Sequence, residues 1–279
     1  MTDFGNEEIP LAGAVTNAGR VFRVGDTVRR PWGAHSAGVQ AVLARLDEKA
    51  PGTAPRPLGR DGQGREVVSW IPGDVALPPF PDWSLTDDYL ASLGRLLRRV
   101  HDALDGWMPP AEVVWNPGFA DPQGGPLIVH TDVCPENVVA RNGLATGLLD
   151  WEFAAPGRRV WDVASTARLC VPFTHPSRRD PATARFGEHE IRRRLGILLD
   201  GYGLSDDGRS ALPAVLDERR RAGERFVLGR VAAGDEAFAH WGTDTGRARL
   251  AAERDWVAGL PADLATQKEH GWAGRGSTG

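Results

Sequence analysis

The stretch "IVHTDVCPENVVARNGLATGLLDWE", residues 128–152, decides the fold because it sets polar side chains around short apolar runs. The segment "PLIV" at 126–129 predicts a short buried strand. That strand ends in His130 and Asp132. Polar side chains at a strand end are often turn formers. The stretch holds more polar side chains than turn formation alone would explain, so we interpret it as a binding or catalytic site.

A β-hairpin is predicted directly after this strand. The apolar runs "VVA" and "GLL" enclose "RNGLAT", which contains the turn pair Asn142–Gly143. Folding the hairpin returns Asp150, at the end of its second strand, close to Asn137, just before its first. Asp132, Asn137 and Asp150 are therefore expected to converge. Two carboxylates and an amide oxygen suit a hard cation such as Mg²⁺, although Asp132 could instead stay free and accept a proton from a hydroxyl.

These residues carry a resemblance to a known family. "HTDVCPEN" fits the H-x-D-x-x-x-x-N arrangement of phosphotransferase catalytic loops, and "LLDWE" is similar to the metal-binding Asp segment that follows it. With the later "RRVWDVAS", the stretch resembles the aminoglycoside phosphotransferase and choline kinase family. The resemblance implies an α+β, bilobal, protein-kinase-like fold. It has a small antiparallel-sheet N-lobe and a larger, mainly helical C-lobe.

The same resemblance implies a role for each polar residue. Asp132 matches the catalytic base, and His130 matches a residue that braces the catalytic loop. Asn137 and Asp150 match the two magnesium-binding positions. Asp162 matches a buried aspartate that holds the loop by hydrogen bonds. Phosphoryl transfer depends on positioning and charge neutralisation more than on covalent steps, so this set would suffice together with a cation for the nucleotide phosphates.

The N-lobe is expected to supply that cation. The family has a lysine on its third strand, but this chain has "TVRRP", so Arg29 takes the position, or Arg30 if the strand register shifts by one. Guanidinium can bind phosphate in a bidentate manner. The glutamate that pairs with the family's lysine is missing, because Val39 falls at its position. Gln40 and His35 are the nearest polar residues.

The remaining nucleotide contacts are expected from two further segments. "VVSWIPG" resembles the family's hinge, where backbone groups of Ser69, Trp70 and Ile71 would meet the adenine of ATP. Gly13 and Gly19 flank "AVTNA" at the position of the glycine-rich cover over the phosphates.

A Pro-rich connector, "PGDVALPPFPDW" at 72–83, predicts the boundary between the lobes. We expect an N-lobe at 1–73 that binds nucleotide. A C-lobe at 74–279 would hold the catalytic loop, metal site and substrate pocket. Helical patterns in the second part include 186–200 and 213–240.

The bulk composition narrows the function classes. The chain has 279 residues and a net charge of −4, which argues against a general nucleic-acid binder. No apolar run approaches the roughly 20 residues of a membrane helix, and the start lacks the pattern of a signal peptide. Cys134 and Cys170 do not form a disulfide framework. A cytoplasmic enzyme without a predicted protein partner is expected.

The expected reaction is transfer of the γ-phosphate of ATP or GTP, with Mg²⁺, to a hydroxyl of an aminoglycoside-like or other amino-alcohol or natural-product substrate. "DWEFAAPGRRVWD" reaches the next helix quickly and leaves little chain for a peptide platform. The alternatives are a nucleotide-binding pseudokinase with a regulatory or scaffold role and a metal-dependent hydrolase. The acidic candidates for substrate binding are Asp200, Glu218, Glu224, Asp235 and Glu236.

Overall fold

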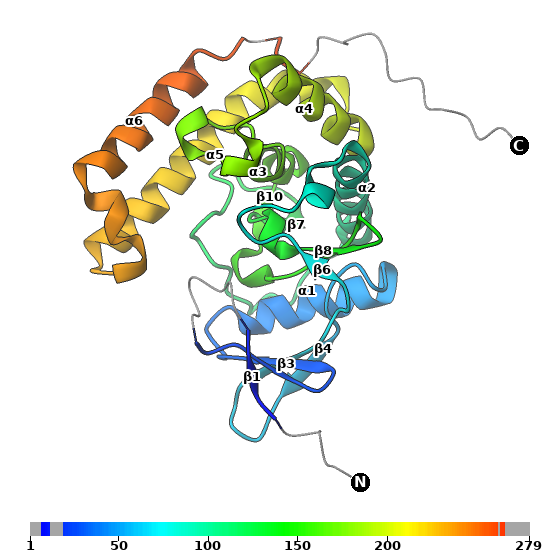
Figure 1. The fold of residues 1–279 in the computed structure, drawn as a ribbon. Helices are drawn as coiled ribbons and strands as arrows, with labels where there is room; N and C mark the ends of the chain where they lie inside the picture. The colour runs from blue at the N-terminus through cyan, green and yellow to red at the C-terminus, as the bar shows by residue number, and fades with distance from the viewer. Residues whose placement is uncertain (1–6, 12–18, 262, 266–279) are drawn as a thin grey trace, which may run out of the picture.

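The computed structural model describes residues 7–11, 19–261 and 263–265, and it has two lobes (Figure 1). The smaller lobe holds a five-stranded antiparallel sheet in the order β1-β2-β3-β5-β4. Helix α1 lies between this sheet and the larger lobe (Figure 1). The elements are β1 (Ile9–Pro10), β2 (Phe22–Val24), β3 (Thr27–Arg30), α1 (Ser36–Lys49), β4 (Pro57–Arg60) and β5 (Glu66–Ser69).

The larger lobe is mainly helical, and its strands lie where it faces the smaller lobe (Figure 1). Its strands are β6 (Asp74–Val75), β7 (Leu127–Val129), β8 (Val138–Arg141), β9 (Leu144–Leu148) and β10 (Ala155–Gly157). Its α-helices are α2 (Asp87–Leu104), α3 (Arg159–Cys170), α4 (Glu188–Tyr202), α5 (Asp206–Ala232) and α6 (Asp244–Ala258). The bilobal α+β, protein-kinase-like fold expected from the sequence is confirmed.

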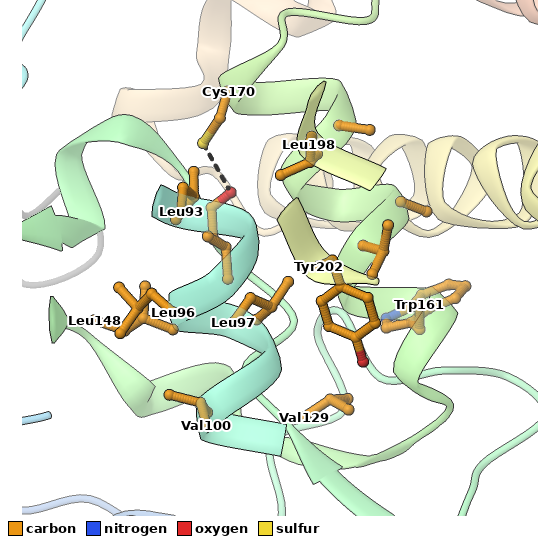
Figure 2. Packing of buried hydrophobic residues seen from close by; sticks show 14 of the residues in the cluster. Leu93, Leu96, Leu97, Val100, Val129, Leu148, Trp161, Cys170, Leu198 and Tyr202 are labelled. Atoms are coloured by element: carbon orange, nitrogen blue, oxygen red, sulfur yellow. Dashed lines mark hydrogen bonds between the residues drawn. The ribbon is translucent and has the colours of Figure 1, made fainter. Parts of the chain in front are cut away.

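Helix α2 forms the centre of the larger core. Its leucines recur at helical spacing, and Leu93 and Leu97 are fully buried against residues such as Leu198 of α4 (Figure 2). Each such side chain contributes about 1.5–3 kcal/mol by leaving water. The two helices approach closely at Gly94, where an added Cβ would lie 2.6 Å from the carbonyl oxygen of Leu198. This packing gives the catalytic segments a rigid support.

The predicted hairpin is present as β8 and β9, which pair in antiparallel fashion. Asn142 and Gly143 have φ angles of +53° and +74°, as a two-residue type I′ turn requires. The N–H of Leu149 donates to the carbonyl of Asn137 at 2.8 Å. The hairpin therefore sets Asp150 beside Asn137, as local turn chemistry predicted.

The chain leaves the first sheet after Ser69, and β6 already pairs with β8 of the larger lobe. We accordingly keep 1–73 and 74–279 as the proposed division of the lobes. Among the described residues, none of the helices combines the length and apolar character needed to cross a membrane.

The helix predicted at 213–240 is wrong in both bounds. Helix α5 starts at Asp206 because Ser205 caps it by accepting a hydrogen bond from the N–H of Gly208. It ends at Ala232, before Gly234 with a φ of +76°.

The catalytic loop between β7 and β8 is anchored to the first turn of α3 by Asp162. This side chain is fully buried. Its Oδ1 accepts from the N–H of Thr131 at 2.6 Å, and its Oδ2 accepts from the N–H of His130 at 2.7 Å. The ring of His101 from α2 meets the same Oδ2 at 3.1 Å. One carboxylate thus fixes two successive backbone N–H groups of the loop.

Thr131 has an unusual backbone conformation, with a φ of +68°. A β-branched residue in the left-handed region carries strain on the order of 1–3 kcal/mol. Its hydroxyl donates to the carbonyl of Phe153 at 2.9 Å, and its own carbonyl accepts from Ser165 and Arg219 at 2.9 and 3.0 Å. These bonds, with the one to Asp162, hold the loop in its strained form.

We predict that Asp162→Asn lowers the free energy of unfolding by about 1–3 kcal/mol at neutral pH, since an amide N–H would then face a backbone donor. Burial alone would raise the pKa of Asp162, but the hydrogen bond and charge of His101 outweigh it and lower the pKa. A depressed folded-state pKa gives stability above the unfolded pKa that is lost as pH falls through the folded pKa. The difference between wild type and variant should therefore narrow in acid.

Urea unfolding between neutral and acidic pH measures both effects. The matched control is Asp47→Asn on the exposed face of α1. An equal loss of stability in the two variants would contradict the anchoring role of Asp162.

Candidate active site

Two cavities meet near the hairpin. The first, about 240 Å³, lies between the lobes and is lined by apolar side chains such as Val28 and Val68. The predicted hinge residues Ser69, Trp70 and Ile71 line it. A narrow apolar slot of this kind suits a planar base.

The same cavity also has polar lining residues. Arg30, Glu136, Asn137 and Asp150 all belong to its lining. Glu136, Asn137 and Asp150 also line a second cavity of about 560 Å³, which has Asp132 in its wall. The two cavities therefore share a polar border, and Asp132 belongs only to the second.

The side chain of Asp132 is partly exposed, and it opens onto the larger cavity. Its side chain is 24% exposed and lies 3.9 Å from Nη2 of Arg219. Burial raises the pKa of Asp132, and the charge of Arg219 partly opposes the rise. A carboxylate that opens onto a cavity and has a raised pKa is a stronger base than a solvated one.

His130 stands behind Asp132 and is fully buried. Its Nε2 donates to the carbonyl of Leu149 at 2.6 Å, and its Nδ1 accepts from the N–H of Asp132 at 3.3 Å. The ring thus ties the catalytic loop to the segment that carries Asp150. These contacts are compatible with a residue that braces the loop, and that role of His130 stays a prediction.

Asn137 and Asp150 present the oxygens that a magnesium ion would need. The Nδ2 of Asn137 donates to the carbonyl of Asp132 at 3.0 Å, which leaves its Oδ1 for a ligand. Asp150 adopts a left-handed conformation with a φ of +56°. No group of three His, Cys, Asp or Glu side chains in the described ranges could hold a metal ion. Two protein oxygens fit Mg²⁺, which relies on substrate phosphates and water for the rest of its shell.

Arg30, not Arg29, lies beside Asp150, so the first choice of register was off by one residue. Nη1 of Arg30 is 3.2 Å from Oδ1 of Asp150. Arg29 instead donates to the hydroxyl of Thr27 and lies 3.4 Å from Asp61. Successive side chains of a strand point to opposite faces, so a shift of one residue moves the guanidinium out of the cavity.

The expected helix glutamate is replaced by Glu66 of the neighbouring strand β5. Glu66 is 2% exposed, and its Oε2 accepts from Nε of Arg30 at 2.6 Å. Its Oε1 accepts from Nε2 of Gln40, on α1, at 2.7 Å. Burial alone would lower the pKa of Arg30, but Glu66 and Asp150 outweigh it and raise that pKa. Arg30 and Glu66 are directly opposite each other in the register of β3 and β5, which the sequence alone does not fix.

The sequence also singled out other residues of the N-lobe. Val39 is buried in the core, and Nδ1 of His35 contacts the carbonyl of Val114 at 3.1 Å. Gly19 has a φ of +71°. Gly13 and the whole of "AVTNA" lie outside the described residues.

Comparisons with known proteins agree with this geometry. A model of the phosphotransferase enzyme family (APH) matches residues 110–198. The trifolitoxin immunity protein of Rhizobium leguminosarum bv. trifolii is 34% identical over 207 residues, which are 72% of this chain and 76% of that protein. The homoserine kinase of Phenylobacterium zucineum (strain HLK1) is 30% identical over 165 residues, 59% of this chain and 44% of the kinase.

Solved structures show the same fold. A microcompartment-associated aminopropanol kinase superposes with a TM-score of 0.60 at 16% identity, covering 90% of this chain and 91% of that one. A choline/ethanolamine kinase family protein from Mesorhizobium loti gives 0.56 at 20% identity, with 91% and 94% covered. Since the family model spans the catalytic loop and the immunity protein is matched over 76% of its length, this chain belongs to the phosphotransferase enzyme family and is a phosphotransferase with an alcohol group as acceptor.

Proposed function

We propose that the protein is a small-molecule kinase that transfers the γ-phosphate of ATP or GTP to a hydroxyl of an amino-alcohol or natural-product substrate. The observation that carries the proposal is the border between the two cavities. Asn137 and Asp150 line both, whereas Asp132 lines only the larger one. A nucleotide in the smaller cavity would direct its phosphates toward this border, and an acceptor in the larger cavity would meet Asp132.

The residues of the site then divide the reaction among them. Asp132 accepts the proton of the acceptor hydroxyl. The hydroxyl oxygen forms a bond to the γ-phosphorus, and the bond from that phosphorus to the β–γ bridging oxygen breaks, releasing the nucleoside diphosphate. Arg30, held by Glu66, neutralises phosphate charge. Magnesium bound at Asn137 and Asp150 would supply further neutralisation.

The acceptor is proposed to be small because only a short segment separates Asp150 from α3, and part of that segment is already paired in a sheet. Residues 155–157 form β10, which pairs with β7, and α3 begins at Arg159. None of the acidic candidates proposed from the sequence lines the larger cavity; Glu136, Glu152 and Asp180 do so instead. These three carboxylates are the proposed contacts for an amine. We also propose, as the sequence suggested, that the protein works in the cytoplasm.

The pseudokinase alternative rested on the missing helix glutamate. Glu66 supplies the carboxylate from β5 and makes two hydrogen bonds, to Arg30 and to Gln40. The argument against catalysis therefore loses its support, and the kinase proposal is preferred.

We predict that Asp132→Asn reduces kcat by about 10²–10⁴-fold, because the amide cannot accept the hydroxyl proton. The affinity for nucleotide should stay near that of wild type, since Asp132 does not line the smaller cavity. Steady-state kinetics and nucleotide titration measure the two quantities. Near-wild-type turnover in the variant would remove Asp132 from the role of base.

Asp150→Ala is expected to abolish magnesium-dependent binding of ATP, and Asn137→Ala is expected to weaken it. Each change removes an oxygen from the proposed metal site. Calorimetric titration of ATP with and without magnesium gives the comparison. If Asp150→Ala keeps the full magnesium effect, the metal site lies elsewhere.

Arg30→Ala should raise the KM for nucleotide, and Arg30→Lys should recover only part of the loss, because an ammonium group cannot make forked contacts. Glu66→Gln should raise the same KM by about 10-fold, because it removes one charged hydrogen bond that holds Arg30. Arg29→Ala is the matched control on the other face of β3. A larger effect at Arg29 than at Arg30 would refute the assignment.

A further inference from the structure

A small recess adjoins the larger cavity, and Asp132 lines both. Its volume is about 120 Å³. Three arginines from different elements line it, namely Arg168 of α3, Arg178 after α3 and Arg219 of α5. Phe119, Asp132, Leu169 and Val227 complete the part of the wall that the recess shares with the larger cavity.

Two of these guanidinium groups are buried and incompletely bonded. The side chains of Arg168 and Arg219 are 7% and 4% exposed. Arg168 donates through Nη2 to Glu253 at 2.9 Å, and Arg219 donates through Nη2 to the carbonyl of Thr131 at 3.0 Å. The Nε of each lacks a hydrogen-bond partner in the described part of the chain. A buried donor without a partner is costly, so each points to a missing acceptor.

The two groups converge over a glycine. A Cβ added to Gly223 on α5 would lie 3.6 Å from Nη1 of Arg219 and 3.8 Å from Nη1 of Arg168. Because Gly223 has no side chain, the space in front of both Nη1 atoms stays open. A planar or tetrahedral oxyanion there could meet both guanidinium groups at once.

Arg178 adds the third charge. Its guanidinium lies over the ring of Trp241, 4.9 Å from the centroid, and donates no hydrogen bond to a described residue. Burial lowers the pKa of Arg178, and the charge of Arg168 lowers it further. Burial lowers the pKa of Arg219 too, and with the charge of Arg168 brings it to about 10. The three arginines thus form one cluster of mutually repelling charges.

Four carboxylates act on this cluster, and each of them has a further partner or role. Asp132 lies 3.9 Å from Arg219, and Glu253 is shared between Arg168 and the N–H of His175. Glu224 also attracts Arg178, but it is engaged by Arg220 and Arg254. Asp162 attracts Arg219, but its oxygens accept from the loop N–H groups of His130 and Thr131. None of these carboxylates bonds the Nε of Arg168 or Arg219, and a bound anion would supply that acceptor.

The anion belongs to the acceptor rather than to the nucleotide. Over the described residues, the recess shares no lining residue with the smaller cavity, whereas it shares Asp132 with the acceptor cavity. The recess, at about 120 Å³, is much smaller than the acceptor cavity and has room for an oxyanion group.

We infer that the acceptor carries a negatively charged oxyanion group, a carboxylate or a phosphate, which binds among Arg168, Arg178 and Arg219 while its hydroxyl meets Asp132. This inference rests on the proposed kinase function and deepens it. The acceptor is then an acidic hydroxyl compound, and an amine on it would contact the acidic wall at Glu136 and Asp180.

Acceptors that share a hydroxyl but differ in charge test the inference. Glycerate, glycerol phosphate and glycerol separate carboxylate, phosphate and neutral acceptors, and L-serine against serinol and L-homoserine against homoserinol add amine-bearing pairs. The members that carry a carboxylate or phosphate should have a kcat/KM about 10- to 100-fold above the partners that lack it. Arg178→Gln should abolish that preference without changing the KM for ATP, and Arg178→Lys should retain part of it. Arg221→Gln, an exposed arginine of α5, is the control.

A binding measurement separates failure of the inference from failure of the kinase proposal. Thermal shifts with glycerate, glycerol phosphate and glycerol at matched ionic strength require no turnover. Stabilisation by either anion that is lost in Arg178→Gln supports the recess even if no acceptor is phosphorylated. Equal shifts in wild type and Arg178→Gln, or equal kcat/KM for acceptors with and without the carboxylate or phosphate, would overturn the inference while leaving the kinase proposal intact.

Discussion

The catalytic site depends on the single carboxylate of Asp162. It accepts hydrogen bonds from two successive backbone N–H groups of the catalytic loop and meets the ring of His101. Those bonds hold Thr131 at a φ of +68°, a conformation that a β-branched residue rarely adopts. Because Asp132 follows Thr131 directly, its direction into the cavity follows from this constraint. The position of Asp162 in the first turn of α3 also favours a negative charge there.

Features that depend on neighbouring residues could be predicted from the sequence. The turn between β8 and β9 needs two residues with positive φ, and the Asn142–Gly143 pair supplies them. Once that turn is recognised, the approach of Asp150 to Asn137 follows from hairpin geometry alone. The fold was predictable for a different reason, since it came from the resemblance of the catalytic loop to a known family rather than from periodicity.

Features that depend on distant residues could not be predicted in this way. Arg30 and Glu66 are 36 residues apart, and their contact exists only because β3 and β5 pair in one register. A shift of one residue would have presented Arg29, and nothing in "TVRR" distinguishes the two faces of a half-buried strand. Arg219 lies 88 residues from Thr131, and its burial arises from the packing of α5. Neither its contact with the loop nor its lowered pKa has a local signature in the sequence.

The placement of buried charge separates the parts of the protein that serve stability from those that serve chemistry. The core around α2 is built from leucine side chains that lose contact with water and need no partner. Where α3, α5 and the catalytic loop meet, arginines are buried instead, and burial of a charge costs stability unless it is fully paired. Arg219 offsets part of that cost by holding the carbonyl of Thr131. Arg168 is likewise paired with Glu253, so what stays unpaired in the described chain is the Nε of each of these two arginines. Buried donors left open beside a cavity are expected where a ligand supplies the acceptor.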